Sequence, residues 1–206
     1  MTVDRIHVLV EEPSMESLLQ ALLPKLVGNL AFEIFRYNGK LDLLDKLPAR
    51  LRGYARWLPP SWRIVVIVDR DDDECDVLKA TLEAIAREAG LVTRTASQGK
   101  RWTVVNRLAI EELEAWYFGD WDAVRKAYPK VPAGVARQAG YRDPDAVAGG
   151  TWEAFLRVLQ RVGYFPGGLR KIEAAATIGP YMVPARNRSR SFQCLQAVFL
   201  EVLGEA

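Results

Sequence analysis

The sequence predicts an α/β fold, in which a mainly parallel sheet carries helices on both faces and a helical C-terminal extension follows. Strand-length runs of β-branched and apolar residues alternate with helix-length periodic segments over the first 110 residues. Half of the 206 residues are hydrophobic and 26% are charged, which is the composition of a globular protein. The chain beyond residue 128 is first rich in Gly and Pro and then helical in pattern.

The first part of the chain alternates strands with helices. Apolar, β-branched runs predict three strands, at residues 5–10, 31–37 and 63–68. Leucines three or four positions apart predict the two intervening helices, at residues 13–27 and 41–57. We expect Ser14 to cap the first helix and Gly28 to end it, and we expect Pro48 to break the second.

The next segment predicts one more helix and two further strands. The helix covers residues 72–89, with Val77 among the residues that face the core and Gly90 as its end. The strands are expected at residues 91–96 and 102–105. Helical periodicity then recurs at residues 110–119, 121–127, 152–162 and 192–203, with a further segment at 169–178.

Composition limits the domain organisation and the location of the protein. Gly and Pro cluster between residues 129 and 150, so we expect an α/β domain over residues 1–128 and a linker with a helical extension over 129–206. No apolar run approaches the roughly 18 residues that span a bilayer, and the start lacks a signal-peptide pattern. Two distant cysteines and a single histidine argue against a disulfide framework and a His-based site. We therefore expect a cytoplasmic protein without a membrane partner.

Acidic residues follow the predicted strands at the points where they end. Glu11 follows the first strand, and Asp69 and Asp71 follow the strand at 63–68. A third acidic group, which includes Glu114, starts the helix after the last strand. Ligands of open α/β sheets bind beyond the carboxyl ends of the strands. These side chains are therefore our candidate catalytic residues.

The residue types in this group suit a hard divalent cation. Carboxylates clustered without a cation would repel one another, and Mg²⁺ prefers one or two carboxylates together with phosphate and water oxygens. We expect Glu11, Asp69, Asp71 and Asp73 to bind Mg²⁺ or Mn²⁺, with Glu11 or Glu114 as acid/base or as ligand of a second ion. An EF-hand loop is excluded, since its sixth and twelfth positions counted from Asp69 are Glu and Ala. For the acids beyond Asp71, a solvated loop is the alternative interpretation.

The order of these groups resembles the TOPRIM fold, in which a Glu after the first strand and a later DxD motif support Mg²⁺-dependent phosphodiester chemistry. More closely, the chain resembles the bacterial domain-of-unknown-function family 4276. Its four landmarks occur here in order, as VEEPSME at 10–16, VDRDDDEC at 68–75, EAWYFGD at 114–120, and Lys171 followed by SRSF at 189–192. The resemblance implies a TOPRIM-like nuclease of the OLD or RloB type, with an ATPase as candidate partner in defence against phage.

The C-terminal region is the basic part of the chain. Residues 151–206 hold seven basic and four acidic side chains. Lys171 could stabilise charge on a scissile phosphate and is therefore a candidate catalytic residue. The candidate phosphate-binding residues are a run of alternating cations and hydroxyls, Arg186, Arg188, Ser189, Arg190 and Ser191.

Two other functions compete with a nuclease. Glu12 stands where the family usually has Gly, and Met15 stands where it usually has an acid. These departures motivate a non-catalytic module that binds a partner ATPase or a nucleic acid. A weaker alternative is a nucleotide-sugar or phosphate-transfer enzyme that uses the same DxD motif. The sequence leaves the choice of DNA or RNA, and the oligomeric state, open.

Overall fold

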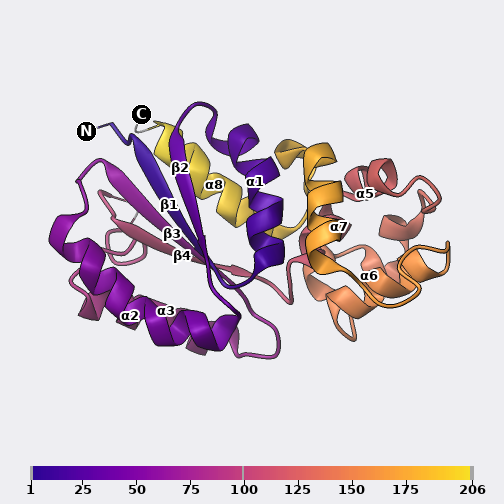
Figure 1. Ribbon diagram of the computed structural model, residues 1–206, viewed down its shortest axis with the longest axis horizontal. Helices are drawn as coiled ribbons and strands as arrows, with labels where there is room; N and C mark the ends of the chain where they lie inside the picture. Colours follow the sequence, from indigo (N-terminus) through magenta and orange to yellow (C-terminus); the bar gives the residue numbers. More distant parts are fainter. Residues whose placement is uncertain (1, 99, 205–206) are drawn as a thin grey trace.

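A four-stranded parallel sheet forms the centre of the chain in a computed structural model, which describes residues 2–98 and 100–204. The strands lie in the order β2-β1-β3-β4 (Figure 1). Their bounds are β1 Arg5–Val10, β2 Ala31–Arg36, β3 Trp62–Asp69 and β4 Val104–Ala109. All three neighbouring pairs are parallel. The predicted α/β class is therefore confirmed.

Helices cover both faces of this sheet (Figure 1). Helices α1 (Pro13–Val27) and α8 (Arg190–Gly204) pack on one face, and α2 (Lys40–Trp57) and α3 (Cys75–Glu88) pack on the other. The strand residues divide accordingly, because successive side chains point to opposite faces. Val8 belongs to the core under α1 and α8, whereas Leu9 belongs to the core under α2 and α3.

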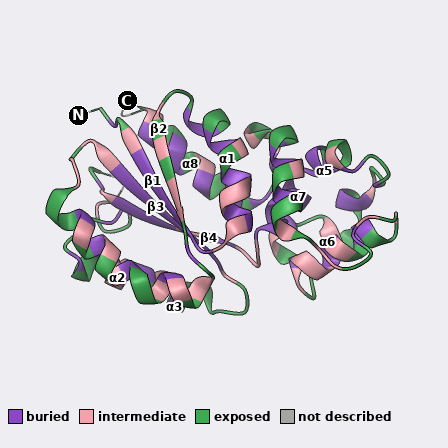
Figure 2. Cartoon of the chain, in the orientation of Figure 1, coloured by how far each residue is buried: buried purple, intermediate pink, exposed green. Residues whose placement is uncertain are grey.

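Burial along the strands follows their place in the sheet. The central strands β1 and β3 are buried over almost their whole length, since helices cover both of their faces (Figure 2). The edge strand β2 is only half-buried. Among the described residues, no helix is long and apolar enough to cross a membrane.

A helical part lies beyond the carboxyl ends of the strands (Figure 1). Its helices are α4 Glu114–Gly119, α5 Trp121–Ala127, α6 Thr151–Gln160 and α7 Lys171–Ile178. Short 3₁₀ turns connect them, at Val135–Arg137, Ala139–Tyr141, Pro144–Ala146, Gly179–Tyr181 and Pro184–Arg186. Helix α4 contacts α6, and α7 contacts both α5 and α1. Helices α4 and α5, from the predicted first domain, thus pack against helices beyond residue 128.

The segment at 91–96 is not the strand that we predicted. It contributes one isolated bridge, from Thr93 to Val104, and then turns away. The hydroxyl of Thr93 accepts a hydrogen bond from the amide of Ala96 at 3.1 Å. The backbone carbonyl of Thr93 accepts one from the amide of Ser97 at 3.0 Å. This local bonding competes with a sheet ladder. The last strand accordingly begins at Val104 rather than at Trp102.

Three local predictions for the helices were also wrong. Pro48 lies inside α2 without breaking it, because a buried stripe that includes Leu47 and Leu51 holds both halves against the sheet. Glu12 rather than Ser14 is the N-cap of α1, and the hydroxyl of Ser14 donates to the Glu12 carboxylate. Val77 is 64% exposed, because α3 turns Leu78 toward the core instead.

Candidate functional site

Glu11 and Asp69 meet at the point where the strand order reverses. The chain passes from β1 to β2 on one side and then crosses to β3 on the other side of β1. The carboxyl ends of β1 and β3 therefore flank the crevice where open α/β sheets bind ligands. The backbone amide of Asp69 donates to Oε2 of Glu11 at 3.1 Å. Both side chains are buried, with Glu11 6% and Asp69 2% exposed.

Glu114 adds a third buried carboxylate to this crevice. It is the first residue of α4, a helix whose six residues are all buried, and its own exposure is 0%. Neither carboxylate oxygen of Glu114 has a hydrogen-bond partner, and Oδ1 of Asp69 lacks one as well. A buried polar atom without a partner is costly. These oxygens are therefore free to bind a ligand.

Burial changes the proton affinity of all three groups. Removal from water raises the pKa of Glu11 to about 7, and repulsion from Asp71 and Glu12 adds to this. Burial likewise raises the pKa of Glu114 to about 7. The pKa of Asp69 lies well above its usual value because of burial and of the charges of Glu11, Glu12 and Glu114. A cation at this point would relieve the repulsion.

Lys171 is the cation that the structure places beside these acids. It is the first residue of α7, and its Nζ lies 3.7 Å from Oε1 of Glu112. The other oxygen of Glu112 accepts from the hydroxyl of Thr151 at 3.0 Å and from the amide of Trp152 at 2.9 Å. Although burial opposes its charge, the neighbouring carboxylates, Glu114 first among them, raise the pKa of Lys171. Lys171 therefore stays protonated.

Asp71 and Asp73 do not join the buried carboxylates. Both are exposed, and both pair with Nζ of Lys40, each at 2.7 Å. Lys40 also donates to the carbonyl of Arg70 at 3.0 Å. Asp71 still lies near enough for its charge to raise the pKa of Glu11. In this arrangement Lys40 neutralises the second half of the DxD motif.

The loops after β3 and β4 hold each other in strained conformations. Asp71 has a φ of 49° and Glu111 a φ of 61°, in the left-handed region that favours glycine. The amide of Asp71 donates to the carbonyl of Glu111 at 2.7 Å, and the side chain of Arg70 pairs with the Glu111 carboxylate. Strain of this kind persists only where the surroundings impose it, and it is common at functional sites.

The buried carboxylates supply some, but not all, of the ligands that a magnesium-like ion needs. Within residues 2–98 and 100–204, no three His, Cys, Asp or Glu side chains have the spacing of a complete metal site. The unpartnered oxygens of Asp69 and Glu114, with Glu11 beside them, nevertheless offer the hard anionic ligands that Mg²⁺ prefers. Such an ion needs only one or two carboxylates when water and phosphate complete its shell.

The predicted phosphate-binding run is mostly engaged in holding the fold. Arg186 binds the buried Asp120 through Nε at 2.6 Å and Nη2 at 3.0 Å. The hydroxyls of Ser189 and Ser191 both bind Asp145, at 2.7 and 3.0 Å. Arg188 is exposed and donates to a backbone carbonyl at 3.2 Å, and Arg190 is exposed. The two serines are therefore buried structural groups rather than surface donors.

Sequence reasoning missed two residues of this region. Lys40, which neutralises Asp71 and Asp73, follows the turn after β2. Because β2 lies beside β1, its exit opens on the same edge of the sheet, and this strand order was the missing signal.

Tyr117 lies one helical turn after Glu114, and its buried hydroxyl has no partner. Burial and the charge of Glu114 raise the pKa of Tyr117. The i, i+3 spacing could have indicated it.

Comparison with known proteins gives one result. A family model described as Domain of unknown function (DUF4276) matches residues 10–201. The match includes the carboxylate cluster, which consists of Glu11, Asp69 and Glu114. It also includes Lys40 and Lys171. No curated protein matches the chain significantly. No solved structure does so either.

Proposed function

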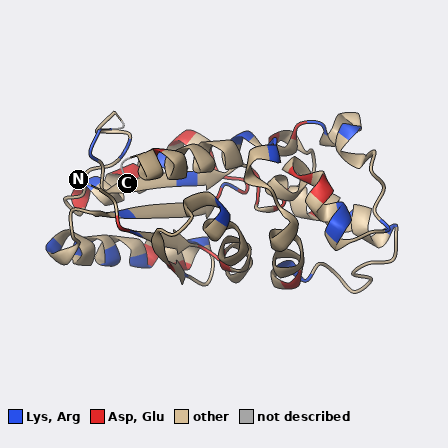
Figure 3. Ribbon diagram, turned by 90° about the horizontal axis from the view of Figure 1, so that it is seen from above, with Lys and Arg blue, Asp and Glu red and all other residues tan. Residues whose placement is uncertain are grey.

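The chain belongs to the DUF4276 family, and we propose that it is a Mg²⁺- or Mn²⁺-dependent nuclease, which hydrolyses phosphodiester bonds. One observation carries the proposal: Glu11 and Asp69 are buried at the reversal point of the sheet, and Glu114 is buried near enough for its charge to act on Asp69. Oxygens of Asp69 and Glu114 have no hydrogen-bond partner. Buried carboxylates repel one another unless a proton or a cation intervenes. Figure 3 shows acidic segments in the middle of the molecule, between the sheet and the helical part.

Each side chain has a distinct part in the proposed reaction. Glu11 and Asp69 would bind the ion, which supplies Lewis-acid charge to the phosphate and to an attacking water. Glu114 has a pKa of about 7, close to the pH at which a general base works best. It would accept the proton of the attacking water. Lys171 would offset the charge that develops on the phosphate oxygens.

The substrate in this proposal is a nucleic acid, DNA or RNA. Arg188 and Arg190 are exposed on the segment that leads into α8, where they can contact backbone phosphates. A partner ATPase and a role in phage defence rest on the family resemblance alone. A cytoplasmic location agrees with Cys75 and Cys194, which are both free and exposed.

A second candidate function has its own supporting observation. Lys40 occupies the oxygens of Asp71 and Asp73 that a metal would use, and no complete three-ligand site exists among the described residues. A non-catalytic module that binds a partner ATPase or a nucleic acid would tolerate this arrangement. It would not need a divalent ion.

Metal binding separates the two candidates before any substrate is known. We would titrate Mn²⁺ and follow the melting temperature of the wild type, of Asp69→Asn and of Asp72→Asn. Asp72 is exposed in the same loop and serves as the matched control. A nuclease should melt at a higher temperature with Mn²⁺, since a ligand of the native state stabilises it. Only Asp69→Asn should lose this shift.

The same three proteins would then be assayed for cleavage of single-stranded DNA, duplex DNA and RNA. Mn²⁺-dependent cleavage that disappears in Asp69→Asn and persists in Asp72→Asn supports the proposal. A wild-type protein that shows no Mn²⁺ shift favours the binding module. Cleavage that survives Asp69→Asn would rule out the assigned site.

A further inference from the structure

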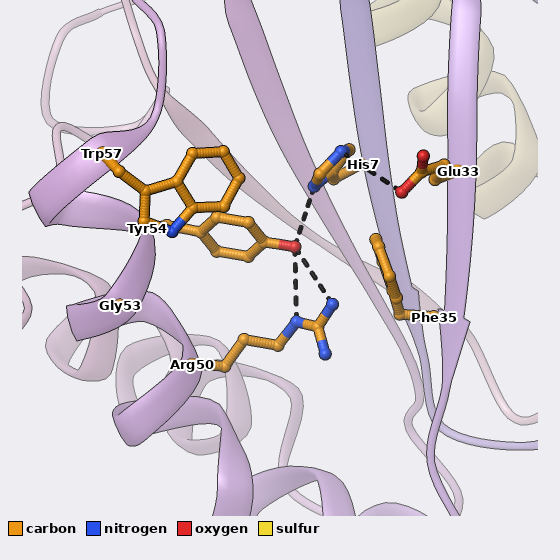
Figure 4. Close-up of a pocket in the computed structure, with 7 residues that line it drawn as sticks. All are labelled: His7, Glu33, Phe35, Arg50, Gly53, Tyr54 and Trp57. Carbon is orange, nitrogen blue, oxygen red and sulfur yellow. Dashed lines mark hydrogen bonds and ion pairs between the residues drawn. The ribbon is translucent and has the colours of Figure 1, made fainter.

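A second pocket lies away from the carboxylate cluster. It has a volume of about 420 Å³ and opens between β1, β2 and the C-terminal half of α2 (Figure 4). His7, on its wall, lies in β1 four residues before Glu11, which follows the strand, a separation of about 13 Å for extended chain. The pocket is therefore a separate feature of the molecule, and the nuclease proposal makes no use of it.

A chain of hydrogen bonds favours one neutral tautomer of His7. Arg50 donates to the hydroxyl oxygen of Tyr54 through Nε at 3.3 Å and Nη2 at 3.2 Å. The Tyr54 oxygen lies 2.8 Å from Nδ1 of His7. Because the Tyr54 oxygen already accepts from Arg50, we assign the Tyr54 hydroxyl as the hydrogen-bond donor to Nδ1, which places the proton of the neutral ring on Nε2. Burial lowers the pKa of His7, which keeps the ring neutral.

This leaves one donor and one acceptor side by side on the strand wall of the pocket. His7 is 4% exposed, and its Nε2 has no hydrogen-bond partner. Oε2 of Glu33 lies 3.7 Å from this nitrogen, which is too long for a direct hydrogen bond. Figure 4 shows both groups on neighbouring strands at the side of the pocket. A ligand edge that carries an acceptor beside a donor would satisfy both.

The other walls suit a flat ring. Trp57 is 56% exposed, and its ring lies 5.4 Å from that of Tyr54. The guanidinium of Arg50 stacks over Phe35 at 3.9 Å. Gly53 keeps the helix side of the pocket open, because a Cβ there would have no neighbour within 4 Å. Glycine is less favourable than alanine inside a helix, so this opening is maintained at some expense of stability.

The surface around the pocket is positively charged. Residues 46–57 contain four Lys and Arg and no Asp or Glu. Arg52 and Arg56 are both exposed on this half of α2. Such a surface attracts anions and favours a ligand that carries phosphate. An aromatic pocket next to clustered cations is also how proteins bind unpaired bases of a nucleic-acid strand.

We propose that this pocket binds the base of a nucleotide, with the ring against Trp57 and its hydrogen-bonding edge against His7 and Glu33. Nucleobases carry acceptors beside donors on their edges, and such an edge would match the donor on His7 and the acceptor on Glu33. The nucleotide phosphate would lie toward the arginines of α2. The ligand is either a free mononucleotide or an unpaired base of a strand, and the chemistry of recognition is the same.

Filling the pocket tests this proposal without disturbing the fold. Gly53→Leu adds bulk where a Cβ meets nothing, and leucine favours a helix over glycine. Ala55→Leu adds similar bulk to an exposed position of the same helix and is the matched control. We would measure binding of the four ribonucleoside monophosphates and of a short single-stranded oligonucleotide by calorimetry. Inorganic phosphate and ribose 5-phosphate report on binding without a base, and EDTA prevents cleavage.

We expect at least one base-containing ligand to bind the wild type and Ala55→Leu, and to bind Gly53→Leu at least tenfold more weakly. Binding of a mononucleotide identifies a free nucleotide, and binding of the oligonucleotide alone identifies a strand. Glu33→Gln, at a half-exposed position, should change the ranking of the bases and provides a second test if Gly53→Leu does not fold. The proposal fails if no base-containing ligand binds the wild type, or if phosphate and ribose 5-phosphate bind as well as the base-containing ligands do. It also fails if Gly53→Leu and Glu33→Gln both bind these ligands as the wild type does.

Discussion

The amide of Asp69 donates a hydrogen bond to Oε2 of Glu11 at 3.1 Å, which joins the ends of the two central strands. This bond favours the charged form of Glu11, yet burial outweighs it and the pKa rises to about 7. Glu11 thus sits near its titration point at neutral pH. A positively charged ligand would stabilise the charged form of Glu11 further than this single hydrogen bond does.

Stability without metal should fall as the pH rises toward neutrality. Glu11 and Glu114 have folded-state pKa values of about 7, above the usual 4.5. Groups of this kind stabilise the fold fully below their unfolded pKa and lose that contribution as the pH passes the folded pKa. We expect the melting temperature in EDTA to be higher at about pH 5 than at about pH 8.

Glu114→Gln provides the control for this pH dependence. It removes one titrating group, and it leaves the opposite contribution of His7, whose pKa burial lowers, unchanged. The decline with pH should therefore be shallower in Glu114→Gln than in the wild type. Curves of equal slope would contradict the raised pKa of Glu114. At about pH 8, Mn²⁺ should restore stability to the wild type if the ion binds the carboxylates.

Lys171 should matter for its charge. If it offsets charge on the phosphate, Lys171→Met should lower kcat about 10²-fold or more, and Lys171→Arg should recover part of this. The Mn²⁺-induced shift in melting temperature should persist in both variants, because Lys171 is not a proposed ligand. A loss confined to KM would instead indicate a role in binding the substrate.

Lys40 competes with any cation for Asp71. Its removal in Lys40→Met should free the carboxylates of Asp71 and Asp73, each now 2.7 Å from its Nζ. We expect Mn²⁺ to bind this variant several-fold more tightly, by calorimetry. Lys46→Met is the matched control, since Lys46 lies on the same helix and pairs with Asp42 instead. Weaker binding to Lys40→Met than to Lys46→Met would contradict this competition and would indicate that Lys40 instead holds Asp71 and Asp73 in place.

Gly119 should be intolerant of any side chain. A Cβ there would collide with the side chain of Asn187 and lie 2.9 Å from the amide of Ser189. Asn187 in turn donates to the carbonyl of Trp116 at 2.9 Å, which ties the segment before α8 to α4 and so positions Glu114. Gly119→Ala should destabilise the protein by about 1–3 kcal/mol in urea unfolding.

Gly140→Ala is the control, because a Cβ there meets nothing within 4 Å. Equal stability of the two variants would show that α4 and the segment at 187–191 can separate without cost. A loss of stability in Gly119→Ala but not in Gly140→Ala would instead explain why the segments EAWYFGD (114–120) and SRSF (189–192) occur together in this chain. They form one packed unit.

The candidate site was only partly visible in the sequence. Glu11 and Asp69 each follow a run of apolar residues, which predicts strands and places both acids at one edge. The metal-binding role of Asp71 and Asp73 was inferred from spacing alone. Spacing cannot reveal the ion pairs with Lys40, because these depend on β2 lying beside β1. The nuclease activity, the ion, the domain boundary at residue 128 and the TOPRIM relation stay predictions.

The sequence by itself determined the parallel α/β architecture, since the period of its apolar residues differs between strands and helices and survives any later packing. It also determined that acids follow β1 and β3. Only the tertiary structure decided which of those acids are buried. Glu114 and Lys171, 57 positions apart in the chain, act on one another because the fold brings the first residues of α4 and α7 within reach of each other's charge. Burial and charge pairing depend on such distant contacts, and no local pattern encodes them.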